Sequence, residues 1–384
     1  MSLNEGAYAP QVVAGQPSWK FQSDLVEAYV TRTAGMLAPV TFRLGERTVQ
    51  PYSIAPWAEE PRDPANPVMI NTLRGDFFCA PFGGNDEPYD GVQYPAHGET
   101  ANLDWTLDEL SVTSAGSVIR LSLDGQARKA HFEKRLELRT GQTVVYSRNK
   151  ISGASGPMDY GHHATLKFPG TPGCARISTS PFVYGQVCAK PFELAELGGY
   201  QSLRQAAEFT SLERVPMISG EFADLTTYPA RLGFEDLLTM INEQGSEFAW
   251  SAAAVASHGY CWFALKDPAV LRDTILWLSN RGRHYAPWSS RHVSVLGIEE
   301  TTSNFHFGIA DSANPNPLTE KGFVTSVNLD PEKPLVVNYI QGVAAIGPDF
   351  DRVAKIERID GGVKLTADSG ASVTTAVDVD FLKG

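Results

Sequence analysis

Two adjacent glutamates that follow an apolar run are the first candidates for proton-transfer chemistry. The run is Val293–Ile298, and Glu299 and Glu300 come directly after it. Both alternating faces of the run are largely apolar, which predicts a buried strand. A carboxylate at the end of a buried strand is costly unless it has a partner or a function. Glu299 alone is better explained by a chain that leaves the sheet for solvent, so its chemistry depends on the histidines upstream.

Three histidines lie in segments that favour a binding site. His97 begins the loop His-Gly-Glu-Thr-Ala-Asn-Leu-Asp-Trp, which ends at Trp105. Such a loop mixes donors and acceptors for hydroxyls with an aromatic ring on which a sugar can stack. A single backbone hydrogen bond would also explain a lone His-Gly pair. His162 and His163 are adjacent in a predicted strand, so they point to opposite faces and at most one lines a given pocket.

Two further segments supply polar or aromatic groups. Arg74 precedes an apolar stretch that ends in Pro-Phe-Gly-Gly and Asn85, and the double glycine permits either close backbone approach or an ordinary tight turn. A basic and aromatic cluster with Arg283 and Trp288 lies just before the glutamate strand, and it could form one wall of a pocket. Its arginines at 281, 283 and 291 could also bind a phosphate or carboxylate, or form a solvated loop that balances an acidic protein.

The elements that must position these groups read mostly as short strands. The chain has 34 Gly and 25 Pro, which fall between short apolar runs as in an all-β protein. The strands predicted from pattern are 40–44, 117–123, 132–138, 143–147, 260–265 and 335–340. A hairpin is predicted around Asp360-Gly-Gly362, with strands 353–359 and 363–367.

Helical signals are few. Residues 201–209 are predicted as one short helix, and 267–279 begins like a helix with Asp267 and Pro268, although its second half reads equally well as a strand. No linker or repeat marks a boundary, so we expect one domain over residues 1–384 that includes the C-terminal hairpin.

Composition narrows the classes of function. The 384 residues carry a formal net charge of -12, which argues against nucleic acids and anionic membranes as partners. The four cysteines are scattered without a CxxC pair, as expected for reduced thiols. No apolar run reaches membrane-spanning length, and the first residues lack the pattern of a secretion signal, so we expect a cytoplasmic protein.

Taken in order, four of these motifs resemble the galactose mutarotase-like superfamily, which contains the aldose 1-epimerases and the hexose-6-phosphate epimerases. The matching positions are Arg74 in RGDFFCAPFGG, His97 in HGETANLDW, His163 in GHHATL and Glu299 in VLGIEE. The similarity covers roughly residues 70–345. His162 stands where commoner members have Asn, and Glu300 stands where they have Pro, so the chain resembles a divergent branch.

The resemblance implies an all-β supersandwich, mostly antiparallel, with the site on a concave face. It implies an aldose 1-epimerase that opens and recloses a sugar ring, with Glu299 as base, His163 as acid and His97 as a hydrogen-bond donor. An anionic Glu299 is expected to raise the pKa of His163. The residues expected to bind substrate are Arg74, Asn85, Trp105, Arg283 and Trp288. No metal or organic cofactor is implied, and the protein is expected to be a monomer or homodimer.

Other readings of the same residues remain open. A non-catalytic carbohydrate-binding protein would use the same groove without needing both Glu299 and His163. A hexose-6-phosphate 1-epimerase would need a basic pocket for the phosphate. A metal site formed by His97, His163 and Glu299 is disfavoured because the chain has no HxH motif.

Overall fold

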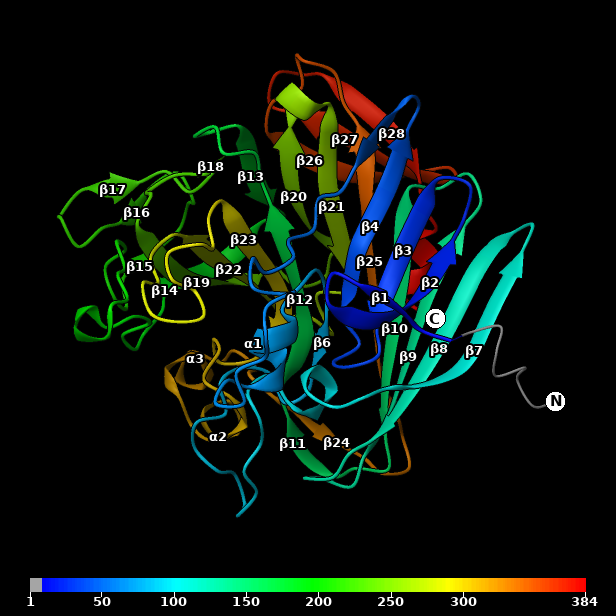
Figure 1. The fold of residues 1–384 in the computed structure, drawn as a ribbon. Helices are drawn as coiled ribbons and strands as arrows, with labels where there is room; N and C mark the ends of the chain where they lie inside the picture. The colour runs from blue at the N-terminus through cyan, green and yellow to red at the C-terminus, as the bar shows by residue number, and fades with distance from the viewer. Residues whose placement is uncertain (1–8) are drawn as a thin grey trace.

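A nine-stranded sheet forms one layer of the molecule in the computed structural model, which describes residues 9–384 (Figure 1). Its pairings are antiparallel. In spatial order its strands are β18 (Thr227–Tyr228), β13 (Ala175–Thr179), β20 (Ala249–Val255), β21 (Tyr260–Lys266), β25 (Leu335–Ala345), β10 (Val144–Ser152), β9 (His131–Arg139), β8 (Gly116–Asp124) and β7 (Thr106–Thr113).

Two further sheets pack against the inner face of this layer, and all three sheets contribute side chains to one buried core. The antiparallel seven-stranded sheet carries the candidate site, and the five-stranded sheet packs beside β8 and β7. The former contains β15 (Glu208–Phe209), β14 (Phe182–Val187), β19 (Phe234–Asn242), β22 (Asp273–Asn280), β23 (Val295–Thr302), β12 (Tyr160–Lys167) and β6 (Phe78–Cys79). The latter contains β1 (Gln11–Val13), β2 (Gln16–Gln22), β3 (Val26–Thr31), β4 (Leu37–Leu44) and β5 (Arg47–Val49).

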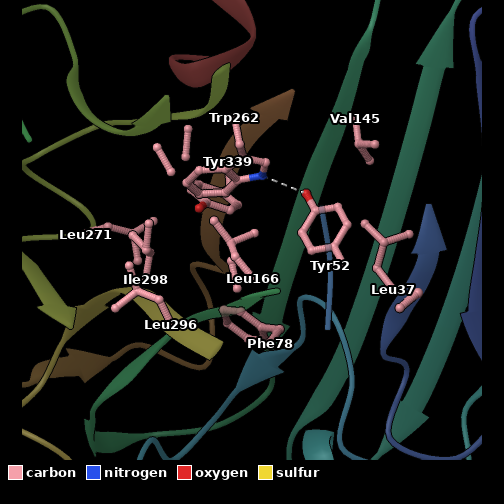
Figure 2. Packing of buried hydrophobic residues seen from close by; sticks show 14 of the residues in the cluster. Leu37, Tyr52, Phe78, Val145, Leu166, Trp262, Leu271, Leu296, Ile298 and Tyr339 are labelled. Carbon is pink, nitrogen blue, oxygen red and sulfur yellow. Dashed lines mark hydrogen bonds between the residues drawn. The ribbon is translucent and has the colours of Figure 1, made fainter. Parts of the chain in front are cut away.

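The main core lies between these layers (Figure 2). Leu296 and Ile298 of the seven-stranded sheet belong to the same buried cluster as Leu37 of the five-stranded sheet and Val145 of the nine-stranded sheet. The Trp262 indole donates a hydrogen bond of 3.2 Å to the Tyr52 hydroxyl, which is drawn as the dashed line in Figure 2. A sandwich with this core is the architecture expected from the sequence, so the all-β prediction is confirmed.

Smaller elements surround the sandwich. The C-terminal sheet of β26 (Val353–Ile359), β27 (Gly362–Ala367) and β28 (Ser372–Ala376) packs against the outer face of the nine-stranded sheet through a second apolar cluster. Two strand pairs are β11 (Gly156–Met158) with β24 (Val327–Leu329) and β16 (Val215–Pro216) with β17 (Phe222–Ala223). The short helices are α1 (Val68–Thr72), α2 (Ile309–Ala313) and α3 (Pro317–Glu320), with 3₁₀ turns η1 (Glu99–Ala101), η2 (Ala195–Leu197), η3 (Ala256–His258) and η4 (Val379–Leu382).

The strands predicted from pattern are present as β4, β8, β9, β10, β21 and β25, and the predicted hairpin is formed by β26 and β27. The short helix predicted over 201–209 is wrong. The backbone N–H groups of Ser202 and Leu203 bind the Asp236 carboxylate instead, and Ala206 has a φ of 57°, which a helix does not allow.

Residues 267–279 follow the strand alternative from Asp273 onward. The Asp267 carboxylate accepts a hydrogen bond from the Ala269 N–H and closes a turn, and β22 then runs between β19 and β23. The glutamate strand also differs in its limits, because it begins at Val295 and continues to Thr302. Glu299 and Glu300 therefore lie within the strand rather than at its end.

Among the described residues, no helix is long and apolar enough to cross a membrane. The first residues of the chain, on which the expectation about secretion rests, lie outside the described range.

Candidate functional site

The floor of the candidate site is the outer face of the seven-stranded sheet, where His163 and Glu299 are direct cross-strand partners. His163 Nε2 lies 3.3 Å from Glu299 Oε1, and both side chains are buried. Cross-strand partners project on the same face because strand side chains alternate. The pairing of β12 with β23 therefore brings together two residues that are far apart in sequence.

Gly297 makes room for this carboxylate. A Cβ at this position would lie 2.8 Å from Glu299 Oε1 and 3.0 Å from the Cβ of Trp277 on β22. Both distances are tight, so a larger residue would push either the carboxylate or the indole out of place. The single glycine in the apolar run is thus explained by the residue two positions further along the strand.

His97 enters the site from a loop held by the double glycine. Its backbone N–H donates to the Gly83 carbonyl at 2.6 Å, and the Gly84 N–H donates to the His306 carbonyl at 2.6 Å. A Cβ on Gly83, whose φ is 92°, would lie 2.4 Å from the His306 carbonyl oxygen. The double glycine therefore serves close backbone approach, and it fixes His97 with its ring centroid 5.1 Å from that of His163.

His306 lines the same cavity and was missed from the sequence. Its Nδ1 is buried without a hydrogen-bond partner among the described residues, as is Nδ1 of His97. The ring packs edge-on against Phe192 with centroids 5.0 Å apart. The signal available in the sequence was a histidine between two phenylalanines, seven residues after Glu299, but no family motif marks that position.

Burial controls the protonation of this site. It raises the pKa of Glu299 to about 8, although the Arg283 guanidinium acts in the opposite direction. Burial, together with the neighbouring His97, lowers the pKa of His163 well below its ordinary value. Burial also lowers the pKa of His97 to about 4. The expectation that Glu299 raises the pKa of His163 is therefore wrong, because burial disfavours the imidazolium and Glu299 itself keeps its proton until about pH 8.

Arg283 and Trp288 form part of the wall, as the sequence indicated. The Arg283 guanidinium lies 4.4 Å from the centroid of the Trp288 ring, and its Nε donates to Glu193 Oε1 at 2.5 Å. Glu193 also accepts a hydrogen bond of 3.1 Å from the Tyr285 hydroxyl. Glu193 had no signal in the sequence, because its segment gave no motif, and it holds the only cationic residue that lines the cavity within residues 9–384.

Arg74 does not join the site. It is fully buried, and its guanidinium donates to the backbone carbonyls of Thr72, Val13 and Ala14 at 3.0, 3.1 and 2.9 Å. Its donors therefore hold the N-terminal hairpin against the segment before β6. The expected convergence of four side chains holds for His97, His163 and Glu299 only.

Two other expected substrate-binding residues are also engaged elsewhere. The Asn85 amide donates to the Gly83 and Pro95 carbonyls at 3.1 and 3.2 Å, while its Oδ1 accepts from the Ile309 N–H at 3.0 Å. The Trp105 indole donates to the Thr100 carbonyl at 3.0 Å and belongs to the main core. Neither side chain lines the cavity.

The neighbours of His163 and Glu299 point to the opposite face, as strand alternation predicts for His162. His162 Nδ1 lies 2.9 Å from Asp76 Oδ2, and its Nε2 lies 3.0 Å from the Asn149 amide nitrogen. Glu300 is bound by Lys266 and accepts hydrogen bonds from Ser251 and Thr274 at 2.5 and 2.7 Å.

A buried polar cluster supports the indole of Trp277. Its Nε1 donates to Glu235 Oε2 at 3.0 Å, while Ser279 donates to Glu235 Oε1 at 3.0 Å. The His292 ring stacks on Trp277 with centroids 5.3 Å apart. Burial raises the pKa of Glu235 to about 7. This cluster fixes the Trp277 ring at 5.8 Å and 79° from His163, so it shapes the floor without entering the cavity.

The cavity that these residues enclose has a volume of about 200 Å³. Liquid water occupies about 30 Å³ per molecule, so the space suits one small ring-sized ligand. Its remaining wall is apolar and comes mainly from α1 and its flanks, with Leu237 from β19. Within residues 9–384 no group of three His, Cys, Asp or Glu side chains is arranged to hold a metal ion, so the geometry gives the metal reading no support.

No family model and no curated protein matches this chain. Solved structures do match it. A Salmonella typhimurium protein provisionally named a mutarotase has a TM-score of 0.58 at 12% identity, with 90% of this chain and 96% of that chain covered. A Lactobacillus acidophilus protein described as a galactose mutarotase related enzyme has a TM-score of 0.54 at 13% identity, with 86% and 98% covered.

A Klebsiella pneumoniae protein provisionally named an aldose 1-epimerase has a TM-score of 0.59 at 13% identity, with 88% of this chain and 82% of that chain covered. At identities this low, the TM-scores and coverages show a shared fold and no more. That fold is the mutarotase-like β-sandwich.

Proposed function

We propose that this chain, which has the mutarotase-like fold, is an aldose 1-epimerase. It would interconvert the α and β anomers of a sugar through Glu299 and His163. The observation that carries the proposal is the pair itself. His163 Nε2 and Glu299 Oε1 lie 3.3 Å apart on the floor of a small, largely apolar cavity. General acid–base catalysis needs titratable groups within reach of the substrate, and both members of this pair line the cavity.

Anomer exchange needs two proton transfers. A base removes the proton of the anomeric hydroxyl while an acid protonates the ring oxygen, and the bond between C1 and the ring oxygen breaks. The resulting aldehyde turns about the C1–C2 bond. The ring then closes on the other face, with the same two transfers in reverse. The reaction needs no redox step, and the pair ends each cycle with the protons it had at the start.

The protonation of the pair suits this cycle. Near neutral pH it holds one proton, which resides mainly on Glu299 because the pKa of Glu299 is about 8 and that of His163 is lowered. Moving this proton to His163 yields the base Glu299 and the acid His163 implied by the resemblance, without a change in net charge. Each residue gives a proton in one of the two steps, ring opening or ring closure, and takes a proton in the other. The reaction therefore requires that the pair holds one proton, whichever residue carries it.

The other residues of the cavity position the sugar. Trp277 and Trp288 offer ring surface on which a pyranose packs, and His97 Nδ1 has no partner among the described residues. His97 stays uncharged because burial lowers its pKa to about 4. It therefore offers a neutral hydrogen bond to the ring oxygen or to a neighbouring hydroxyl.

The basic cluster gives little support to a phosphorylated sugar. Arg283 is paired with Glu193, and Arg291 is paired with Glu60 at the surface. A phosphate would have to replace Glu193, or lie beside it and meet its repulsion. An uncharged sugar is the better match to this cavity.

The test is exchange between anomers, measured by NMR saturation transfer on a panel of aldoses with wild type and Glu299→Gln. We expect exchange above the uncatalysed rate in wild type, and a loss of about 10²–10⁴-fold in the variant. Exchange that is unchanged in Glu299→Gln would remove this residue from the mechanism. Binding without exchange for every sugar would instead favour a non-catalytic carbohydrate-binding protein.

A further inference from the structure

The wall of the cavity contains a polar group, against which Phe192 and Trp288 pack, and an apolar group that includes no polar side chain. The polar group comes from β12, β23 and three loops, and the apolar group comes from the segment around α1 and from β19. The polar side chains are His97, His163, Arg283, Glu299 and His306. The apolar side chains of the second group are Pro67, Met69, Ile70, Leu73 and Leu237.

The polar group forms one continuous patch. The rings of His97 and His163 are 5.1 Å apart, and His163 contacts Glu299. The backbone of Gly83–Gly84 binds both His97 and His306, which keeps these two histidines close together. The Arg283 guanidinium lies 5.4 Å from the centroid of the Trp277 ring, which is itself 5.8 Å from the His163 ring, so it borders this patch.

The apolar group is also continuous. Trp57 links α1 to the aromatic wall, because its Nε1 donates to the Ile70 carbonyl at 2.7 Å and its ring lies 4.8 Å from that of Trp288. Across the sheet, Leu237 on β19 is the cross-strand partner of Trp277 on β22. The floor therefore changes from His163 and Glu299 on β12 and β23 to indole and leucine on β22 and β19.

Backbone groups on the α1 side are already used. The Ile70 carbonyl binds Trp57, and the Leu73 carbonyl accepts a hydrogen bond of 3.0 Å from the Ala55 N–H. The Met69 N–H donates to Asn102 Oδ1 at 3.1 Å. A ligand hydroxyl pressed against Met69 and Leu73, the buried part of this wall, would lose its water and find no partner.

From this division we infer that the substrate is an uncharged sugar that carries an apolar group, such as a deoxy position, on the edge away from Glu299. The polar patch binds the anomeric centre, the ring oxygen and the nearby hydroxyls. His306, whose Nδ1 has no hydrogen-bond partner among residues 9–384, lies beside His97 in this patch. The α1 wall binds the edge where a hydroxyl is replaced by hydrogen. The inference rests on the proposed function, since it concerns the substrate of the same site.

The test compares sugars that differ by a single oxygen. The first pair is 6-deoxy-D-galactose with D-galactose, and the second is 4-deoxy-D-glucose with D-glucose, in which the changed carbon lies across the ring from C1. An unsatisfied buried hydroxyl costs about 1–3 kcal/mol, so kcat/KM for anomer exchange should favour a deoxy sugar by about 5–150-fold in at least one pair. A preference for the parent hexose in both pairs would overturn the inference and leave the aldose 1-epimerase proposal intact.

A variant pair locates the effect at the α1 wall. Ile70→Gln places an amide on the half-buried wall, where it can bind a hydroxyl, and should reduce the deoxy preference about tenfold or more in the favoured pair. Val68→Gln adds the same amide to the same helix at a position that is 37% exposed and does not line the cavity. It should leave the preference unchanged. Equal preferences in wild type and Ile70→Gln would overturn the assignment of this wall.

Binding provides a measurement that does not depend on turnover. Saturation-transfer-difference NMR competition between each deoxy sugar and its parent hexose measures their relative affinity. Tighter binding of a deoxy sugar, even in a protein that shows no exchange, would support the inference while the proposed enzymatic function failed. Equal or weaker binding of both deoxy sugars would contradict the inference whatever the rate of exchange.

Discussion

The two faces of β12 and β23 carry the same pair of residue types in different surroundings. On the outer face, His163 and Glu299 contact each other and a cavity. On the inner face, His162 contacts Asp76 and Asn149, while Glu300 binds Lys266, Ser251 and Thr274. One histidine–glutamate pair is therefore left available for a ligand, and the other is built into the core.

The difference shows how partners decide the use of a buried ionisable group. Burial alone would raise the pKa of Asp76, but His162, Lys134 and Gln341 together bring it below its ordinary value. Glu299 has no such set of donors among residues 9–384, and its pKa is raised to about 8. Buried charges need paired, hydrogen-bonded partners, whereas a group that titrates near neutral pH is kept without them.

The largest expected effect is on catalysis and distinguishes the two histidines. His163→Asn removes the transferable proton and should reduce kcat for anomer exchange by about 10²–10⁴-fold. Combined with Glu299→Gln, it should lose little more than the worse single variant, because the two act as a unit. The control is His162→Asn, which should reduce stability but leave kcat of the folded protein within a few-fold. A larger loss of kcat in His162→Asn than in His163→Asn would reverse the assignment of the faces.

The next effect concerns the stability of the inner face. Lys266→Met leaves Glu300 buried without its cation, which typically costs about 3–5 kcal/mol. Urea unfolding should show this loss. Arg291→Met, which breaks a surface pair with Glu60, is the matched control and should cost less than about 1 kcal/mol. Equal losses in the two variants would show that the inner-face network contributes no more than a surface ion pair.

The outer face should instead become more stable when its acid is neutralised. In the unfolded chain the Glu299 carboxyl ionises near its ordinary pKa of 4.5, while in the folded protein it keeps its proton until about pH 8. Wild type should therefore lose stability relative to Glu299→Gln as the pH rises between these values, by about 1.4 kcal/mol per pH unit at most.

Thermal unfolding of both proteins at pH 5 and pH 9 measures this change. Glu299→Gln should melt close to wild type at pH 5 and clearly above it at pH 9. Glu300→Gln is the inner-face comparison and should melt below wild type at both values, because it discards the partner of Lys266. A Glu299→Gln protein that is less stable than wild type at pH 9 would show that His163 and the other neighbours do stabilise the Glu299 carboxylate.

The smallest expected effect is on the pH dependence of activity. The pair must hold one proton, and it loses that proton above the pKa of Glu299, so kcat/KM should fall about tenfold per pH unit above about pH 8. Glu235→Gln removes the neighbouring carboxyl whose pKa is raised to about 7, and it should keep the same high-pH decline. A decline that disappears in Glu235→Gln would move the controlling group from the cavity to the cluster beneath Trp277.

Much of the fold follows from local patterns. Alternating apolar residues set β8, β9 and β10, and the turn at Asp360–Gly362 set the C-terminal hairpin. These features depend on side-chain alternation and turn chemistry, which act within a few residues. The helix predicted over 201–209 is absent because of a long-range contact. The backbone N–H groups of Ser202 and Leu203 donate to Asp236, which lies on the distant strand β19.

The order of residues along the chain specified which residue types were available to the site and, through strand alternation, that His162 and His163 would face opposite sides. Four motifs in order also identified the fold. Tertiary packing then determined which of the candidate side chains line the same cavity. Arg74, Asn85 and Trp105 were drawn into backbone contacts, while His306 and Glu193 were brought in without any motif. The type of each side chain can be read directly from the sequence. Its partners depend on how distant segments pack together, so the function of a side chain is decided only in the folded structure.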